Sequence, residues 1–248
     1  MCGRYYNRRQ KQEIAERMRV KKVFEAPYLP NYNVAPTTFQ PIVRQERESD
    51  EREMVLARWG LVPHFAKSLA DFKGFSTFNA RAEGIAKAPT WRSPFKSRRC
   101  LVPVDGFYEW KALDDSKKPK KQPYAITLKT REPMALAGLW DAWKEPKAQP
   151  KNPDIWLQSF AIITTEANEI MSSIHTRMPV ILRERDWERW LSRGTEEQPP
   201  IDLLRPYDSD MMELAPCNPA VGAVKNNGPA MLVCPTPEDE SLNLLNSQ

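Results

Sequence analysis

Cys2 stands directly after the initiator Met1, which is the one position where a cysteine can carry two nucleophiles. Once Met1 is removed, Cys2 has an α-amine and a thiol on adjacent carbons. The amine has a pKa of about 8, so a useful fraction of it is uncharged near neutral pH and can attack an aldehyde to form an imine. The thiol can then close a thiazolidine ring, which an internal cysteine cannot form because its nitrogen is an amide.

Position alone favours a different interpretation, in which Cys2 is an inert residue of a frayed terminus. Three features argue against it. A small residue after Met1 permits Met removal, and Gly3 lets the backbone approach another surface closely. Arg4-Tyr5-Tyr6 then begins a segment with ordered character. The N-terminus is therefore the first candidate for a reactive site.

The chain is basic, with 37 Lys and Arg residues against 32 Asp and Glu residues, a net charge of +5 and a pI of about 9.0. Cations cluster in residues 96–99 and 117–121. This favours an anionic partner, although many basic proteins bind no nucleic acid. The ring-opened sugar of an abasic site is an aldehyde carried by a polyanion, so single-stranded DNA with abasic sites fits both the charge and Cys2. Opening that sugar requires proton transfer, and an acid or base is expected nearby.

The cysteine and histidine content argues against a metal site, and we expect no cofactor. The chain has four cysteines and two histidines, without a Cys-x-x-Cys pair, and we expect reduced thiols. No apolar run approaches the ~20 residues that span a bilayer, and no apolar signal segment follows Met1. We therefore expect no membrane partner. We expect a monomer in the cytoplasm, at damaged DNA of the nucleoid if the source is bacterial, or in the nucleus if it is eukaryotic.

The elements that would position these residues are mostly short strands. Apolar runs rich in β-branched and aromatic residues predict strands at residues 41–44, 54–59, 100–104, 108–111, 123–128, 134–139, 156–163 and 178–182. Helical spacing predicts helices at residues 8–19, 166–174 and 186–191, with Thr165 and Asp186 as caps. Residues 26–36 are expected to form a fixed loop with several prolines, and residues 112–121 and 144–153 to form long hairpin loops.

These elements predict an α+β fold that is mainly β. We expect a single domain over residues 1–234, built on a curved antiparallel sheet or barrel with a few peripheral helices. Residues 235–248 are acidic and polar, which predicts a flexible tail.

Several sequence blocks resemble the SRAP family, the SOS-response-associated peptidases or abasic-site processing proteins. The blocks occur in the family's order over about residues 1–230, and the first of them contains Cys2, which makes the resemblance specific. They are Met1-Cys2-Gly3-Arg4-Tyr5, Tyr32-Asn33-Val34-Ala35-Pro36, Arg58-Trp59-Gly60-Leu61-Val62-Pro63, Asn79-Ala80-Arg81-Ala82-Glu83, Arg98-Arg99-Cys100-Leu101-Val102-Pro103, Asp105-Gly106-Phe107-Tyr108-Glu109-Trp110, Ala137-Gly138-Leu139-Trp140 and Ile174-His175-Thr176-Arg177-Met178-Pro179.

The resemblance implies catalytic roles for four residues. Cys2 would form the thiazolidine, and Asn79 would hold the N-terminal residue and the sugar by hydrogen bonds. Glu109 would be the acid and base of ring opening and imine formation, and His175 would hydrogen-bond the opened sugar and help the proton transfers. Taken alone, the same residues favour plainer roles: a turn cap for Asn79, a solvent-facing strand position opposite its two aromatic neighbours for Glu109, and a helix cap for His175.

The resemblance also implies a set of DNA contacts. Arg4, Arg81 and Arg177 are candidate phosphate ligands, and Lys225 belongs to a late block that would contact the backbone. Solvated surface is the plainer interpretation of all four.

Aromatic residues are the second DNA feature. Bases stack on aromatic rings in single-strand binders, which makes Trp59, Phe65 and Tyr108 candidates, although an aromatic residue in a β domain usually lies in the core. The family's wedge beside the lesion corresponds to Pro36 and to His64-Phe65, and some relatives carry Trp where Phe65 stands.

Three functions stay open at this point. The favoured one is a DNA-damage-response protein that senses abasic sites in single-stranded DNA, forms a covalent thiazolidine cross-link through Cys2 by lyase-like imine chemistry, and shields the site. The second is a cysteine peptidase using Cys2, Glu109 and His175, with cleavage of its own N-terminus as the favoured form. The third is a non-covalent single-strand binding module, which would not need Cys2.

Overall fold

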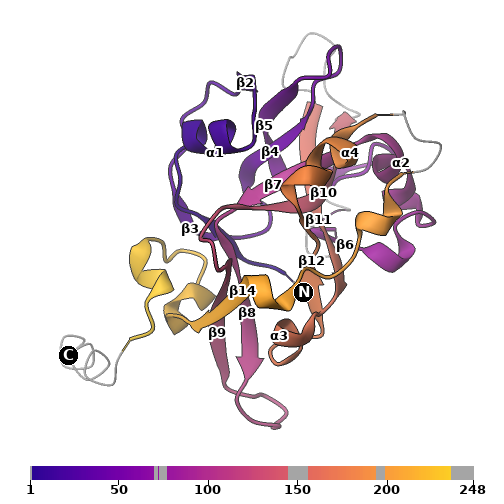
Figure 1. Cartoon of the computed structure of the whole chain (residues 1–248). Coiled ribbons are helices and arrows are strands. Elements are labelled where there is room, and N and C mark those ends of the chain that lie inside the picture. The colour runs from indigo at the N-terminus through magenta and orange to yellow at the C-terminus, as the bar shows by residue number, and fades with distance from the viewer. Residues whose placement is uncertain (1, 70–71, 73–76, 145–155, 194–198, 236–248) are drawn as a thin grey trace.

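Two β-sheets form the framework of the computed structural model, which describes residues 2–69, 72, 77–144, 156–193 and 199–235 (Figure 1). One sheet closes into a barrel. The other is an open antiparallel sheet of five strands that contains the N-terminal strand. The predicted fold, α+β and mainly β with a barrel-like sheet, is confirmed.

The barrel closes because both edges of strand β5 (Arg52–Trp59) are paired. One edge runs antiparallel to β4 (Phe39–Gln45), and the other runs parallel to β11 (Trp156–Glu166). The circuit is completed by β10 (Met134–Lys144) and β7 (Arg99–Val104), which join β11 to β4. Short strands extend this sheet, namely β2 (Lys22–Val23), β6 (Asn79–Arg81), β12 (Arg177–Pro179) and β13 (Ile181–Leu182).

The open sheet holds the strand that follows Cys2. Its strands, in spatial order, are β14 (Met212–Pro216), β9 (Lys121–Leu128), β8 (Gly106–Ala112), β1 (Tyr5–Asn7) and β3 (Asn31–Val34). Tyr5 of β1 pairs with Phe107 of β8 on one edge and with Val34 of β3 on the other. The predicted loop over residues 26–36 is therefore wrong for β3, because Pro30 and Pro36 bound a strand here and do not interrupt it.

The barrel interior is filled by apolar side chains from alternate strand positions. Its fully buried members include Ile42, Ala57, Trp59, Val102, Leu136, Phe160 and Ile162. Gly138 is required by the packing, because a Cβ at this position would lie 2.8 Å from Cys100 Sγ and 2.9 Å from Val102 Cγ2. This filled interior gives the site a rigid support.

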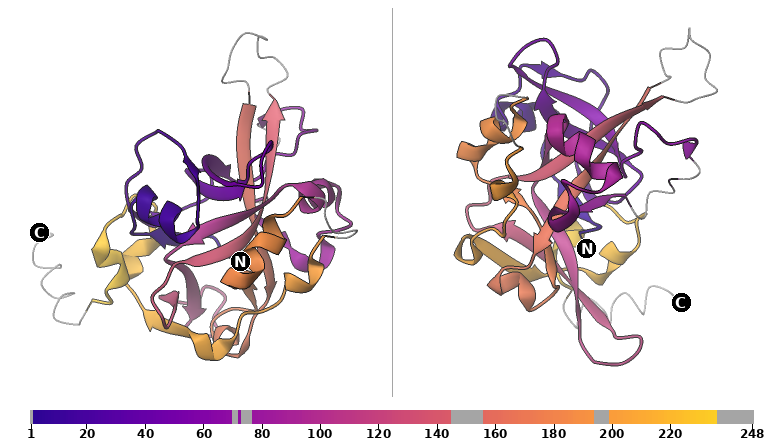
Figure 2. Two further views of the ribbon diagram at one scale, coloured as in Figure 1. Left: turned by 45° about the horizontal axis from the view of Figure 1, so that its top comes forward. Right: turned by 90° about the vertical axis from the view of Figure 1, so that its right-hand side faces the viewer.

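Helices cover the outer face of the barrel (Figure 2). They are α1 (Lys11–Arg17), α2 (Pro89–Ser97) and α4 (Trp187–Leu191). Ile14 of α1, Phe95 of α2 and Trp190 of α4 belong to one buried cluster with outward-facing barrel residues. The short helix α3 (Glu169–Ser172) instead contributes Met171 to the cluster that contains Cys2.

The helices differ from prediction at their ends. Strand β11 continues through Glu166, so α3 is capped by Asn168, whose side-chain oxygen accepts a hydrogen bond from the Met171 amide at 3.0 Å, and not by Thr165. Asp186 precedes α4 without a side-chain capping bond. Helix α2 was not predicted, because Pro89 in its first turn and Pro94 inside it hide the helical pattern.

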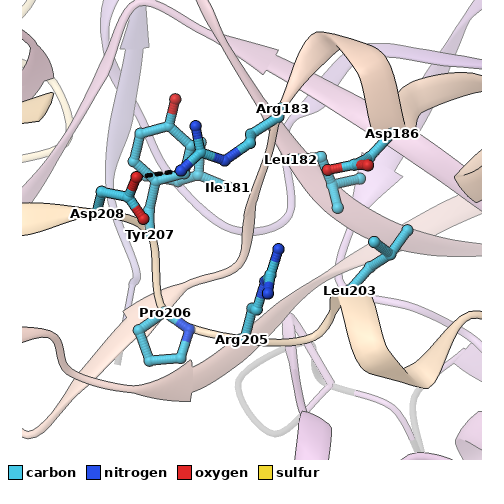
Figure 3. Close-up of a pocket in the computed structure, with 9 residues that line it drawn as sticks. All are labelled: Ile181, Leu182, Arg183, Asp186, Leu203, Arg205, Pro206, Tyr207 and Asp208. Carbon is cyan, nitrogen blue, oxygen red and sulfur yellow. Dashed lines mark hydrogen bonds and ion pairs between the residues drawn. The ribbon is translucent and has the colours of Figure 1, made fainter.

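A small pocket lies where residues 201–211 fold against β13 (Figure 3). Arg183 forms an ion pair with Asp208 and lies over the ring of Tyr207, 5.3 Å from its centroid. The pocket holds only about 20 Å³, which is room for one water molecule. We conclude that these contacts fasten the segment that leads to β14.

The remaining sequence predictions concern loops and boundaries. A hairpin loop joins β8 to β9, as predicted for residues 112–121. The predicted loop at residues 144–153 and the tail at 235–248 lie almost wholly outside the described residues, and the domain boundaries stay a prediction. Among the helices that the structure describes, none has the length and apolar character needed to cross a bilayer.

Candidate active site

The side chain of Cys2 is fully buried beside the end of the barrel at which β5 finishes. Tyr5 connects the Cys2 segment to the end of β5, because its ring centroid lies 5.0 Å from that of Trp59. The Sγ of Cys2 lies 4.0 Å from the backbone oxygen of Arg4. Burial raises the pKa of the Cys2 thiol well above its usual range, and the negative charge of Glu109 raises it further. The raised pKa favours the neutral thiol, and Glu109 lies within electrostatic range of it.

Asn79 fixes the backbone of Cys2. Its side-chain Nδ2 donates a hydrogen bond to the Cys2 carbonyl oxygen at 2.8 Å. Asn79 is placed by strand pairing, since β6 runs parallel to β11 with Asn79 opposite Ile162. The Oδ1 atom of Asn79 is buried and has no hydrogen-bond partner among the described residues, so it can accept a hydrogen bond from a ligand.

Glu109 enters the site from the middle of β8. It is only 4% exposed, so it is not the solvent-facing residue that its strand position alone would suggest. Phe107, two residues earlier, belongs to the same buried cluster as Cys2, whereas Tyr108 belongs to a different cluster on the opposite face, as the alternation predicted. Burial raises the pKa of the Glu109 carboxyl, and the positive charge of His175 partly opposes this.

His175 follows α3 and is anchored at both its backbone and its ring. Its amide donates to the Met171 carbonyl at 2.9 Å. Its ring Nδ1 lies 2.9 Å from the backbone nitrogen of Arg177, which can only donate. The same Nδ1 lies 3.2 Å from the backbone oxygen of Arg177, so the Arg177 backbone fixes the orientation of the ring.

The four side chains come from the N-terminus, β6, β8 and the turn before β12, and the folded chain gathers them around Cys2. Residues 1–224 match the family described as SOS response associated peptidase, SRAP. The chain belongs to the SRAP family.

Named relatives of this SRAP protein include bacterial and animal proteins. It is 38% identical over 235 residues to the abasic site processing protein YoqW of Bacillus subtilis, which covers 94% of this chain and 99% of that one. It is 30% identical over 239 residues to the abasic site processing protein HMCES of Rattus norvegicus, covering 83% of this chain and 65% of that one. A crystal structure of a protein from Bacteroides thetaiotaomicron matches with a TM-score of 0.79 and 25% identity, covering 95% of this chain and 100% of that chain.

Two of the predicted phosphate ligands of this SRAP protein differ in their availability. Arg81 is exposed beside the site, at the end of β6. The guanidinium of Arg177 is held by both carboxylate oxygens of Glu83 and by the Thr164 carbonyl at 2.7 Å. Its side chain is only 15% exposed. Arg81 is therefore the more available cation of the pair, and Arg177 is already engaged.

The other two predicted ligands are Arg4, which precedes β1 and contacts the loop over residues 219–227, and Lys225, which lies on that loop. Arg4 donates to the Gly222 carbonyl at 3.2 Å, and burial lowers the pKa of its guanidinium. Lys225 is exposed. The side-chain amide of Asn33 holds the loop by donating to the carbonyls of Val221, Ala223 and Asn226 at 2.9–3.1 Å. Asn33 was not singled out from the sequence, although it lies in the Tyr32–Pro36 block.

The aromatic candidates separate into core and surface residues. Trp59 is fully buried, and its indole nitrogen donates to the Phe78 carbonyl at 2.9 Å. The prediction that Trp59 contacts DNA is therefore wrong for this structure, because no face of its ring is available for a base. Tyr108 is fully buried as well. Phe65 is 52% exposed, and half-buried Pro36 lies at a turn, so both residues are available to contact a DNA strand.

Metal binding receives no support from the residue clusters. Among the described residues, no group of three or more His, Cys, Asp or Glu side chains has metal-ligand geometry. All four cysteines are free thiols, and only Cys234 is exposed.

Proposed function

We propose that this SRAP protein reacts through Cys2, after removal of Met1, with the ring-opened sugar of an abasic site in single-stranded DNA. The product is a thiazolidine that shields the site. The observation that carries the proposal is the position of Cys2, which Asn79 fixes by its carbonyl while the buried carboxyl of Glu109 lies within electrostatic reach. The relatives supply the substrate class, because they are abasic site processing proteins.

Glu109 is proposed to move the protons. Its pKa is raised by burial, so the carboxyl can hold a proton, give it to the ring oxygen as the ring C–O bond breaks, and take up the proton that the anomeric hydroxyl loses. The α-amine of Cys2 then adds to the aldehyde carbon, and the resulting carbinolamine loses water to give the imine. The Cys2 sulfur adds to the imine carbon while its proton passes to the nitrogen. One water molecule is released overall.

Asn79 and His175 are proposed to orient the opened sugar. The imidazole of His175 would hydrogen-bond a sugar hydroxyl, and the unpartnered Oδ1 of Asn79 would accept from a hydroxyl or from the amine. Arg4, Arg81 and Lys225 would contact phosphates, with Arg177 joining them if Glu83 releases it. Phe65 and Pro36 would contact the bases beside the lesion. The protein would work as a monomer wherever single-stranded chromosomal DNA is exposed.

Self-cleavage of the Met1–Cys2 bond is the second candidate, supported by the peptidase in the family's description. General peptidase activity on other proteins is less well supported. Cysteine peptidases attack with a thiolate, whereas burial raises the pKa of the Cys2 thiol. Imine formation begins with the amine, so this raised pKa does not impede its first step.

A denaturing gel tests the proposal directly. Single-stranded DNA with one abasic site is mixed with the wild type, with Cys2→Ala, and with Cys234→Ala as a control for an exposed cysteine outside the site. We expect a heat-stable shifted band for the wild type and Cys234→Ala, and none for Cys2→Ala. Intact-mass measurement establishes whether Met1 is absent from the reactive protein. A processed wild type that gives no band would refute covalent chemistry, and full function in Cys2→Ala would favour the non-covalent module.

A further inference from the structure

The barrel has a second opening, at the end away from Cys2. Trp59, near Cys2, is the last residue of β5, and Glu53 lies near the start of that strand. At this end the inward-facing positions beyond the apolar core are polar or aromatic. They are occupied by Arg44, Glu53, Trp140 and Gln158. They line a cavity of about 740 Å³, which we call the far mouth. This volume is typical of small-molecule sites.

The far mouth lies at the end of the barrel where β7 begins. Strand β7 begins at Arg99, opposite Leu139 of β10. Strand β10 continues to Lys144, whereas β4 ends at Gln45, which the pairing of Val43 with Leu101 places level with Arg99. Strand β10 therefore borders a gap beyond the start of β7. The polar rim of this gap contains Arg98 and Asp141, which form an ion pair with Nε and Oδ1 3.2 Å apart.

The floor of the far mouth contains buried polar atoms without partners. Arg44 pairs with Glu53 through Nε and Oε1 at 2.7 Å, and its guanidinium lies over the Trp140 ring, 4.0 Å from the centroid. Arg44 Nη1, Trp140 Nε1 and Gln158 Oε1 are buried and lack hydrogen-bond partners within the described part of the chain. Such groups are unfavourable unless water or a ligand satisfies them.

The rim carries excess positive charge. Glu53 and Asp141 are matched by Arg44 and Arg98, whereas no ion pair joins Arg47 or Arg193 to a carboxylate among the described residues. The pKa of Arg193 is lowered by burial and by the nearby charges of Arg44 and Arg47. Like charges held this close together favour an anion between them.

An exposed aromatic ring stands beside these cations. Trp156, at the start of β11, lines the far mouth and is 57% exposed. The ammonium group of Lys144 lies 6.0 Å from its ring centroid. A flat apolar surface next to a cluster of cations matches the two parts of a nucleotide, which are a stacking base and a phosphate.

We infer that the far mouth binds a nucleotide unit of single-stranded DNA, separate from the site around Cys2. The phosphate is bound by Arg47 and Arg193. The base stacks on Trp156, and its edge reaches the unpartnered donors and acceptor of Arg44, Trp140 and Gln158. This inference does not depend on the covalent chemistry of Cys2, because undamaged DNA is sufficient for the interaction.

The test uses the full chain and a fluorescent oligothymidine of about eight nucleotides without a lesion. Binding is measured by anisotropy for the wild type, for Trp156→Ala and for Arg47→Glu with Arg193→Glu. The matched control is Lys117→Glu with Lys118→Glu, which changes the net charge equally in the exposed turn between β8 and β9. Unlabelled thymidine monophosphate and hexaglutamate serve as competitors. A 5-iododeoxyuridine oligonucleotide supplies a photo-cross-link that peptide mapping can locate.

We expect Trp156→Ala to weaken binding about fivefold or more, the loss that follows from removing one stacked base. The double Arg variant should weaken binding about tenfold. The slope of log K against log salt concentration should become shallower by about 0.7 for each phosphate that is no longer neutralised. The photo-cross-link should map to Trp156 or Trp140. Competition by thymidine monophosphate would identify free nucleotides as ligands too, and its absence would restrict the site to strands.

Other results would overturn the inference. Equal weakening by the control variant would mean that overall charge, and not the far mouth, binds DNA. Displacement by hexaglutamate at the same concentration as by oligothymidine would indicate an acidic peptide site. A cross-link that maps only to residues around Cys2 would also exclude nucleotide binding at the far mouth.

Discussion

The Nδ2 atom of Asn79 and the carbonyl oxygen of Cys2 are joined by a 2.8 Å hydrogen bond. This bond ties the start of β6 to the segment that leads into β1. It uses the carbonyl of Cys2 and leaves both the nitrogen and the sulfur available for reaction. Asn79 therefore sets the direction of the nucleophiles without consuming either of them.

Asn79→Asp should slow cross-linking without abolishing DNA binding. The variant keeps the size of the side chain, loses the donor and faces the carbonyl oxygen with a carboxylate. A buried unsatisfied polar group costs about 1–3 kcal/mol, so we expect a rate reduced by about tenfold or more. Single-turnover kinetics on denaturing gels give the rate, and anisotropy with undamaged DNA gives the affinity. Equal losses in both measurements would make Asn79 a binding residue only.

Glu109→Gln should change the pH profile of cross-linking. The acid form of Glu109 is the proposed proton donor, and its fraction falls as pH rises through the raised pKa. The wild-type rate should therefore contain a descending limb that is missing in the variant, whose rate should be lower by about a hundredfold or more. The measurement is the single-turnover rate from about pH 5 to about pH 9. An identical profile in the two proteins would remove Glu109 from the chemistry.

The same substitution should stabilise the protein at alkaline pH. Burial raises the folded-state pKa of Glu109 above its ordinary value of 4.5. Its contribution to stability is therefore fully present below the unfolded-state pKa and is lost as pH rises through the folded-state pKa. We expect Glu109→Gln to have a higher melting temperature than the wild type at about pH 8, by about 2–4 °C for each kcal/mol gained in the free energy of unfolding. This difference in melting temperature should shrink toward about pH 4. A wild type that gains stability relative to the variant as pH rises would contradict the assignment.

Glu83→Gln should increase affinity for single-stranded DNA. Both oxygens of Glu83 now bind the guanidinium of Arg177, and the variant loses the negative charge that competes with phosphate. The Glu83 side chain is 58% exposed, so the loss of the ion pair should lower stability by only about 0–1 kcal/mol. Anisotropy titrations over a salt series compare the variant with the wild type. In an Arg177→Ala background, Glu83→Gln should have a smaller effect, and an undiminished one would exclude release of Arg177 as the cause.

The sequence was most informative where local pattern and side-chain chemistry coincide. The alternation of Tyr108 and Glu109 placed the carboxyl on the correct face of β8, but burial of Glu109 depends on β1 and the Cys2 cluster, which local pattern cannot reveal. Trp59 was assigned to DNA because aromatic side chains suit both cores and bases. Only the closed barrel shows that the Trp59 ring is buried in the core.

Long-range pairing explains what was missed. Strand β1 has three residues and no strong period, and it exists because β3 and β8 flank it. The Glu83–Arg177 pair joins residues 94 positions apart, and Asn33 reaches residues 188–193 positions away. No spacing rule connects such positions, since tertiary structure brings them together.

The two-sided pairing of β1 has a mechanical consequence. A protein attached to DNA through residue 2 would receive any pull on that DNA, for instance from a translocating motor, directly at the entrance to this strand. The load would pass into two hydrogen-bonded ladders, through Tyr5 to Val34 and through Tyr5 to Phe107, and from there into the rest of the open sheet. The attachment point is thus embedded in the sheet, and detaching it by force requires breaking contacts on both sides at once.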